Sequence, residues 1–443
     1  MAATVARAES RTTSIGKAGW RALAASWLGW MFDGYETYAL VLVMTPALHQ
    51  LLALDRLPRA SIYMGGLLTV TLLGWAAGGI GAGVLADYVG RRRTLMLSIL
   101  WYAVFAGLTA LSWDYWSLLI FRFFTGIGLG AEWGPGAAIV AEFWPPASRG
   151  RAAGALHSAY GFGLLLASGI WLLLNPLGPS SWRYMFVIGI LPAFLLLYVR
   201  RWVDEPALWV AANQDRREAQ KRLEMGGVSP QDRELVQFTV TRILSEPELR
   251  RRVGLLLLMS MTTVVGWWSA SMWIPQYAAQ IATNAGHPSQ LSSSLVGLMF
   301  SAGSIAGYVV LGLLADILGR KPTTWLYYLG ALVLSLCFFL LTNDRRALLI
   351  MAAANGFFSG GQFAWMTIYL PELFPTRVRG SAICLVCNSS RIVAGLGPLL
   401  AGWLISFFGG IGTAAATMSL IYIVGLIVTP FAGPETKGKP LPA

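Results

Sequence analysis

The sequence contains few charged residues. Asp, Glu, Lys and Arg account for 12% of its 443 residues, whereas hydrophobic residues account for 56%. Soluble domains carry about 25% charged residues, so this chain has too little polar surface for a soluble fold of its length. A bilayer requires about 20 apolar residues for each helical crossing, and about twelve such runs follow one another along the chain. The sequence therefore predicts an all-α membrane protein with twelve transmembrane helices.

Cysteine is also scarce. The three cysteines, Cys337, Cys384 and Cys387, all lie within apolar runs. The spacing of Cys384 and Cys387 also occurs in redox and metal sites, but no second pair or histidine accompanies it, which favours packing within a helix. The sequence contains no phosphate-binding glycine loop, no metal-ligand cluster and no Ser-His-Asp arrangement. We therefore expect no enzyme activity, no cofactor and no metal.

Negative charge is scarcer than positive charge, with 21 Asp and Glu against 33 Lys and Arg. If twelve helices cross the membrane, most basic residues fall on the face that carries both termini. The opposite face holds only Arg56, Arg59, Arg183, Arg345 and Arg346. Basic loops stay on the cytoplasmic side, so we expect both termini in the cytoplasm and the chain in the cell membrane. The basic excess thus reflects topology and does not indicate a nucleic-acid partner.

Two short charged motifs each occur twice. GVLADYVGRRR at 83–93 returns as GLLADILGRK at 312–321, with an offset of 229 residues. AEFWPPASRG at 141–150 returns as PELFPTRVRG at 371–380, with an offset of 230. A repeat at a nearly constant offset predicts two halves of six helices each, related by an axis along the membrane normal.

The ends of the two halves follow the same repeat. Glu205 and Glu435 each come just after the last apolar run of a half, again 230 residues apart. The segment between the halves is rich in both charges, and we expect a solvated linker with short amphipathic helices. The predicted organisation is a cytoplasmic tail (1–19), a first six-helix bundle (20–199), a central cytoplasmic loop (200–252), a second six-helix bundle (253–431) and a cytoplasmic tail (432–443).

These motifs, together with the stretch from Arg122 to Gly130 and the tail PETKG at 434–438, resemble the major facilitator superfamily, in the branch of metabolite and aromatic acid:proton symporters that is related to sugar porters. FDGYETYALVLVMTP in the first run is similar to the DG-aromatic-D signature of aromatic acid:proton symporters, with Glu36 at the second acidic position. GAEWG at 130–134 is similar to that group and also to sialate and lactate symporters. The resemblance implies two pseudo-symmetric bundles around a central cavity and transport by alternating access.

Two departures narrow the resemblance. The seventh run reads TTVVGWWSASMWIPQY and lacks the glutamine-rich pattern of sugar porters, and the fifth run lacks the Gly-Pro-Gly-Gly pattern of drug antiporters.

The charged residues of the repeated motifs are expected to latch the cytoplasmic helix ends through weak, exposed ion pairs. These gating residues are Asp87, Arg91, Arg92, Glu142, Arg149, Asp316, Arg320, Glu372 and Arg379.

Five Asp, Glu or Arg residues lie inside the apolar runs: Asp33, Glu36, Arg122, Glu132 and Arg391. A charge at bilayer depth costs about 2.5–3.5 kcal/mol on insertion scales, so such a residue faces a cavity or a partner. We interpret Asp33, Glu36 and Glu132 as proton-coupling residues and the two arginines as ligands of an anionic substrate. The alternatives are a permanent ion pair between Arg122 and an acid of the first run, and a bracing role for Glu132.

Aromatic and amide side chains complete the predicted site. The predicted substrate-binding set is Tyr35, Trp268, Gln362, Trp365 and Asn388, together with Arg122 and Arg391. Aromatic residues also concentrate at membrane interfaces, and amides also join helices, so packing roles remain open for each. His157, alone on its helix, is interpreted as structural.

The sequence as a whole predicts a monomeric, proton-coupled symporter of a small organic carboxylate, an aromatic acid in particular. Two alternatives stay open. One is a symporter or facilitator of a sugar or polyol, or of a sialate or lactate type of acid. The other is a membrane sensor that resembles a transporter and signals through the central loop.

Overall fold

The computed structural model describes residues 16–286 and 289–442, and within these ranges it contains helices and no strands. Six membrane-crossing segments come from the first half: α2 (Lys17–Leu51), α3 (Ala60–Val89), α4 (Arg91–Ala110), α5 (Tyr115–Phe143), α6 (Arg149–Leu174) and the pair α7 (Trp182–Ile188) and α8 (Leu195–Trp202). Six come from the second half: α12 (Pro247–Asn284), α13 (Ser289–Leu318), α14 (Arg320–Leu341), the pair α15 (Arg345–Asn355) and α16 (Ala364–Leu373), the pair α17 (Arg379–Ala394) and α18 (Gly397–Phe407), and the pair α19 (Ile411–Ser419) and α20 (Tyr422–Val428).

Shorter elements join these segments. Between the halves lie α9 (Ala207–Glu224), α10 (Pro230–Val236) and α11 (Thr239–Ser245). Single helical turns are η1 (Leu54–Arg59), η2 (Pro146–Ser148), η3 (Asn175–Leu177), η4 (Leu191–Phe194), η5 (Gly356–Gly360), η6 (Gly361–Phe363) and η7 (Thr429–Phe431).

Nine segments of the described residues are long and apolar enough to cross a membrane by themselves. The three others are α2, α5 and the pair α17–α18. Helices α2, α5 and α17 carry the five Asp, Glu and Arg residues that the sequence places inside apolar runs, and α17 ends before Gly395. The segments outside these nine are thus the ones that carry the charges, and their polar groups lie inside the protein rather than in lipid.

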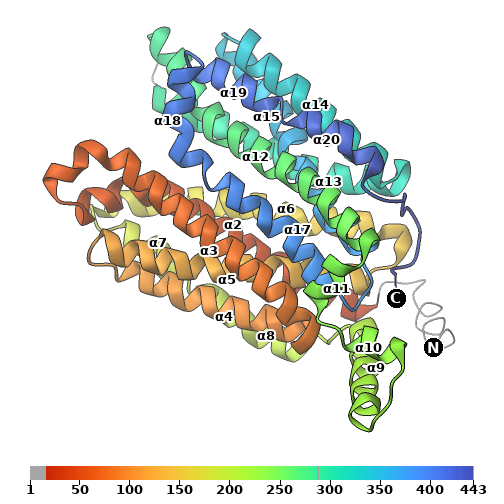
Figure 1. The fold of residues 1–443 in the computed structure, drawn as a ribbon. Coiled ribbons are helices and arrows are strands. Elements are labelled where there is room, and N and C mark those ends of the chain that lie inside the picture. The colour runs from red at the N-terminus through yellow and green to blue at the C-terminus, as the bar shows by residue number, and fades with distance from the viewer. Residues whose placement is uncertain (1–15, 287–288, 443) are drawn as a thin grey trace.

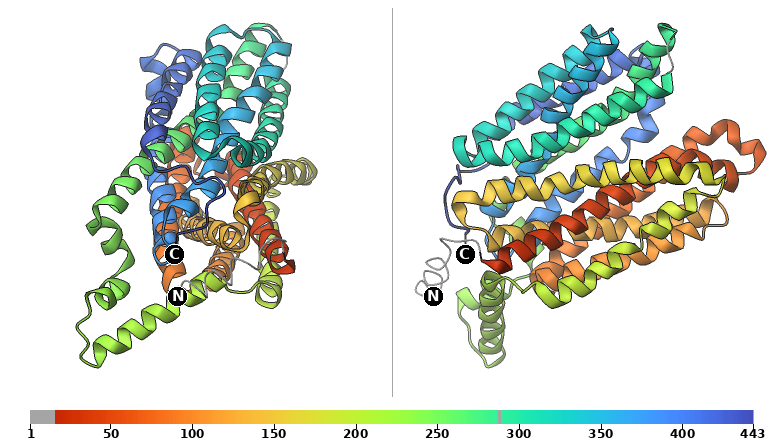
Figure 2. Two further views of the ribbon diagram at one scale, coloured as in Figure 1. Left: turned by 90° about the vertical axis from the view of Figure 1, so that its right-hand side faces the viewer. Right: turned by 180° about the vertical axis from the view of Figure 1, so that it is seen from behind.

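The two halves form two helical bundles that lie side by side (Figure 1). They contact each other along α3 and α17 and along α6 and α13. Both contacts include the ends of α3 and α13 that carry Asp87 and Asp316, and we call this the closed end. The bundles lie farther apart at the other end, where η1 is found (Figure 2), and we call that the open end.

Two glycines turn the chain at the closed end. Gly90 and Gly319 have φ angles of 118° and 109°, which glycine adopts without strain. A Cβ at Gly90 would lie 2.8 Å from the carboxylate of Glu205, and a Cβ at Gly319 would lie 2.9 Å from that of Glu435. The repeated motif therefore ends one helix and starts the next within a single residue, in the same way in both halves.

The central segment is helical and packs against the closed end. Its first two helices are joined by a salt bridge of 2.7 Å between Arg222 and Asp232, and the hydrogen bonds from this arginine lower the pKa of the aspartate. Thr239 of α11 lies 2.9 Å from Ser381 of α17, hydroxyl to hydroxyl. The segment is therefore attached to the bundles and is more than a free linker.

Candidate functional site

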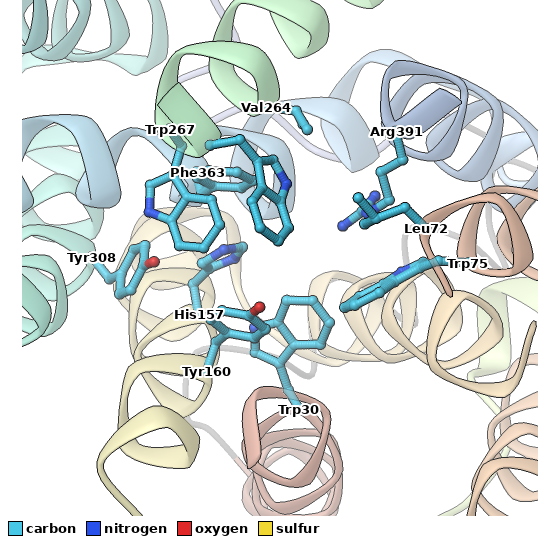
Figure 3. A pocket seen from close by; sticks show the side chains of 11 residues that line it. Trp30, Leu72, Trp75, His157, Tyr160, Val264, Trp267, Tyr308, Phe363 and Arg391 are labelled. Atoms are coloured by element: carbon cyan, nitrogen blue, oxygen red, sulfur yellow. The ribbon is translucent and has the colours of Figure 1, made fainter. Parts of the chain in front are cut away.

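A small cavity lies between the two bundles. Its walls come from α2, α3 and α6 of the first bundle and from α12, α13, η6 and α17 of the second (Figure 3). The lining residues are Trp30, Leu72, Trp75, His157, Tyr160, Val264, Trp267, Trp268, Tyr308, Phe363 and Arg391.

Arg391 is the cation of this cavity. Its Nη1 donates to the carbonyl oxygen of Cys387 at 2.8 Å and to Oδ1 of Asn388 at 3.1 Å, which hold the guanidinium in place. The guanidinium carbon lies 4.8 Å from the ring centroid of Trp75, and Figure 3 shows the two side chains on the same side of the cavity. No carboxylate of the described residues forms a salt bridge with Arg391. Its charge is therefore available to a ligand.

Aromatic rings form the rest of the wall and join the bundles. The His157 ring of α6 lies 4.8 Å from that of Tyr308 and 5.9 Å from that of Phe363, both in the second bundle, and 5.7 Å from Trp30. Its Nδ1 has no hydrogen-bond partner among the described residues. Aromatic pairs at these distances contribute about 0.5–1.5 kcal/mol each beyond area burial, so a planar ligand has several faces to stack on.

Two carboxyl groups beside the cavity lack a cationic partner. Asp33 and Glu132 are fully or almost fully buried, and neither forms a salt bridge with a described residue, although the Tyr102 hydroxyl interacts with Glu132. Glu132 packs so closely against α2 that a Cβ at Gly29 would overlap with it. Asp33 lies within electrostatic range of both Glu132 and Arg391. A buried carboxylate without a cationic partner is unfavourable, which makes both groups candidates for binding a proton.

Glu36 and Arg122 form an ion pair of 2.9 Å inside the first bundle, and both side chains are 0% exposed. Glu36 packs against Gly189, and the Arg122 guanidinium carbon lies 5.3 Å from the ring of Phe186. The structure therefore brings these two predicted site residues together, but Arg122 lies outside the cavity in this conformation.

The closed end is held by two symmetric sets of contacts across the bundles. In the first set, Glu142 of α5 pairs with Arg379 of α17 at 2.7 Å and with Arg91 of α4 at 3.4 Å. Asp87 accepts hydrogen bonds from the backbone amides of Gly380 and Ser381 at 3.0 and 2.8 Å.

In the second set, Glu372 of α16 pairs with Arg320 at 2.8 Å and with Arg149 of α6 at 3.2 Å. Asp316 accepts hydrogen bonds of 3.0 Å from the amides of Gly150 and Arg151. The side chains of Arg91, Glu142 and Arg379 are 0% exposed, so the expectation of weak, exposed pairs is wrong. The motifs meet each other across the interface, which excludes water from them.

A family model described as "Sugar (and other) transporter" matches residues 22–443. The chain belongs to this family. It is a transporter of the major facilitator superfamily and not an enzyme.

Curated relatives and solved structures cover nearly all of the transporter. A "Putative metabolite transport protein" of Haemophilus influenzae is 33% identical over 97% of this chain and 100% of its own. A "Probable 4-methylmuconolactone transporter" of Cupriavidus pinatubonensis is 29% identical over 94% and 90% of the two chains. A "Cis,cis-muconate transport protein" of Acinetobacter baylyi is 26% identical over 94% of each. The proton:xylose symporter XylE bound to 6-bromo-6-deoxy-D-glucose has a TM-score of 0.77 at 19% identity, over 97% and 98% of the two chains. This likeness establishes the fold of twelve helices in two bundles.

The other predicted binding residues of the transporter lie at different depths. Trp268 lines the cavity, and Asn388 stands behind Arg391. Tyr35 donates to the carbonyl oxygen of Met185 at 2.8 Å, inside the first bundle. In the second bundle, the side-chain amide of Gln362 donates to the carbonyl oxygen of Ser359 at 2.9 Å. The indole of Trp365 donates to the Thr263 hydroxyl at 2.9 Å. These three side chains do not line the cavity in this conformation.

One predicted gating residue stays within its own half. The backbone amide of Arg92 donates to Glu205 at 3.2 Å, and its guanidinium donates to the carbonyl oxygen of Arg200. The remaining gating residues all take part in the two contact sets across the interface.

Sequence reasoning missed most of the aromatic wall. The missed residues are Trp30, Trp75, Tyr160, Tyr308 and Phe363. For His157 the sequence predicts only a structural role. Trp30 lies three residues before Asp33, and Tyr160 lies three residues after His157, so each shares a helix face with an ionisable neighbour. That spacing is the signal that was available in the sequence.

Proposed function

We propose that this transporter is a proton-coupled symporter of a small aromatic carboxylate, which it carries by alternating access. The observation that carries the proposal is the position of Arg391. It is a buried cation that faces an aromatic cavity, is held by a backbone carbonyl and an amide, and has no carboxylate partner among the described residues.

A substrate carboxylate supplies the missing partner. A guanidinium binds a carboxylate through two parallel hydrogen bonds, and such charge-assisted bonds are about twice as strong as neutral ones. The ring of the same substrate then stacks against Trp30, Tyr160 or Trp267, which line the same cavity as Arg391. The printed names of two relatives, which refer to cis,cis-muconate and 4-methylmuconolactone, support a metabolite of this class.

Asp33 and Glu132 carry the coupled protons in this proposal. Both are neutral acids while they are buried without a cationic partner, and neutrality lets Arg391 keep its charge for the substrate. Release of a proton from Asp33 creates an anion within electrostatic range of Arg391, which then competes with the substrate for the guanidinium. The Glu36–Arg122 pair remains a fixed element of the first bundle through this step.

The closed end is the cytoplasmic end in this proposal, because the basic motifs lie there. The described conformation then admits substrate from outside. Loading the cavity draws the open ends of the bundles together, and the two contact sets at the closed end separate to release substrate and protons inside.

Binding of the purified protein to benzoate, nicotinate, cis,cis-muconate and xylose tests the substrate class, and uptake into proteoliposomes with an inward proton gradient tests transport. We expect at least one of the acids to bind, and Arg391→Gln to weaken that binding about tenfold or more. Arg346→Gln, an exposed arginine at the start of α15, is the matched control and should leave binding unchanged.

Three outcomes contradict the proposal. Binding of xylose but of no acid would identify a sugar transporter. Binding of an acid without flux would favour a sensor. Uptake that does not change when a proton ionophore is added would exclude proton coupling.

A further inference from the structure

A second concave site lies on the outside of the second bundle, away from the central cavity. It is a groove at the closed end, between the start of α12 and the end of the last crossing segment. The lining residues are Glu248, Arg251, Arg252, Leu255, Pro430, Phe431, Ala432, Gly433 and Pro434.

The groove has an excess of positive charge. The guanidinium of Arg252 already has partners, because it pairs with Glu248 and donates to the carbonyl oxygen of Leu373 at 3.1 Å. Arg251 is exposed and forms neither a salt bridge nor a side-chain hydrogen bond with any described residue. Lys321 adds a further positive charge at the edge of the groove, where its Nζ donates to the backbone carbonyl of Pro430 at 2.6 Å. Glu248 is the one carboxylate among the lining residues.

The groove also continues into the apolar outer surface. Leu255 lines it one turn beyond Arg251, and Leu258 follows on the same helix with 43% of its surface exposed. On the neighbouring segment Phe431 is 63% exposed, and Ile427, one turn before it, is 62% exposed. The arginines thus stand at the boundary between the polar end of the protein and its lipid-facing side.

The first half of the chain provides an internal comparison. At the offset of 230 residues, Arg251 corresponds to Arg21 and Ala432 corresponds to Trp202. The guanidinium carbon of Arg21 lies 4.5 Å from the ring centroid of Trp202, so an aromatic side chain covers this arginine. Ala432 offers no ring to Arg251. The two halves therefore differ at this place, and only the second leaves its arginine uncovered beside a groove.

We propose that this groove binds an anionic phospholipid, with the headgroup phosphate on Arg251 and the acyl chains along Leu258, Ile427 and Phe431. A guanidinium provides paired donors for phosphate oxygens. Basic pockets between transmembrane helices at the level of the headgroups bind anionic lipids by this chemistry. The apolar continuation of the groove selects a lipid over a free phosphate ion.

The test uses the purified full-length protein in detergent and needs no transport substrate. The unfolding temperature is measured with added dioleoylphosphatidylglycerol, dioleoylphosphatidylcholine or inorganic phosphate, and native mass spectrometry counts the lipids retained. We expect the anionic lipid alone to raise the unfolding temperature, by about 2 °C or more. Arg251→Gln should lose this rise and should retain less of the anionic lipid.

The symmetric arginine gives the matched control. Arg21→Gln removes the same charge from the covered position and should keep the full response to the anionic lipid. An equal loss of the temperature rise in Arg21→Gln would mean that lipid binding depends only on the overall charge of the protein. An unchanged temperature rise in Arg251→Gln would mean that the lipid binds elsewhere. An equal rise with inorganic phosphate would identify a free anion as the ligand. Each of these three results overturns the proposal.

Discussion

Asp87 in α3 accepts a hydrogen bond of 2.8 Å from the backbone amide of Ser381, the third residue of α17 in the other bundle. The Ser381 hydroxyl donates to the same carboxylate at 2.7 Å. A carboxylate at a helix N-terminus is stabilised by the unpaired amides and by the helix dipole. Asp316 makes the equivalent contact with the N-terminus of α6. The repeated motif of one half therefore caps a helix of the other half, and the caps hold the closed end together.

Asp87→Asn should weaken the closed end. Hydrogen bonds to a charged group contribute about 1.5–3 kcal/mol, so the substitution should raise the population of the opened state about tenfold or more. Cys384 reports this state, because it is fully buried against Gly83 and Gly134 between the bundles. With the other two cysteines replaced by alanine, its rate of labelling by N-ethylmaleimide should rise by the same factor. Asp344→Asn, a helix cap elsewhere in the second half, is the control and should not change the rate.

Arg216 of α9 should act on the same equilibrium from the central segment. It donates to the carbonyl oxygens of Asp87 in one bundle and Arg377 in the other, at 3.0 and 3.2 Å, and lies 4.4 Å from the ring of Tyr88. Arg216→Gln should therefore increase the Cys384 labelling rate about threefold or more, as expected for loss of roughly 1 kcal/mol. The neighbouring exposed residue Arg217 supplies the control. If Arg217→Gln has the same effect, the contacts of Arg216 with the two bundles have no specific role in keeping the closed end together.

Asp33→Asn should separate proton movement from substrate movement. The variant keeps a neutral side chain at a position where burial favours the neutral acid, so substrate exchange across proteoliposomes should persist. Accumulation of the same acid driven by a pH gradient should fall to the background rate. Asp114→Asn, which alters the half-buried N-cap of α5, tests for general effects and should leave both rates unchanged. Continued accumulation by Asp33→Asn would remove this residue from the coupling mechanism.

Gly78→Ala should destabilise the first bundle, whereas Gly81→Ala should not. A Cβ at Gly78 would overlap with the backbone of Ile127 in α5, but a Cβ at Gly81 meets no atom within 4 Å. Overpacking of a core costs about 1–3 kcal/mol, which should lower the unfolding temperature by several degrees. At the open position alanine should be neutral or slightly stabilising, because it favours helix more than glycine does. Equal unfolding temperatures for the two variants would contradict the close approach of α3 and α5.

Glu435 should give the folded protein an acid-sensitive contribution to stability. Burial raises the pKa of Glu435, but hydrogen bonds from the amides of Arg320, Lys321 and Lys437 outweigh burial and leave the pKa below its usual value. A lowered carboxyl pKa stabilises the fold above the unfolded pKa of about 4.3, and this stabilisation is lost as the pH falls through the folded pKa. The unfolding-temperature difference between wild type and Glu435→Gln should therefore be largest near neutral pH and shrink as the pH falls below the unfolded value.

Glu205, the equivalent residue of the first half, should show the opposite sign. Burial raises its pKa in spite of the amide of Arg92, so the folded protein binds the proton more tightly than the unfolded chain. Wild type should gain stability relative to Glu205→Gln as the pH falls through the folded pKa. A pH dependence of the same sign in both variants would contradict the assignment.

Several features of this transporter follow from the sequence alone. The repeated motifs indicate two similar halves, because both copies of each motif occur in the sequence at nearly the same offset. Charged residues within apolar runs identify Asp33, Glu132 and Arg391 as exceptional, since lipid does not tolerate them without a cavity or a partner. These inferences depend on composition and spacing, which folding does not alter.

The partners of those residues depend on the tertiary structure. Helices such as α3 are apolar on nearly all sides, so no hydrophobic face tells which way Trp75 points. The rotation of each helix is set instead by close glycine contacts with its neighbours, as between Gly78 and Ile127. That rotation pairs Arg122 with Glu36 inside a bundle and leaves Arg391 facing the cavity. The sequence shows that both arginines lie in the membrane, but only the packing of the helices decides which of them is free to meet a substrate.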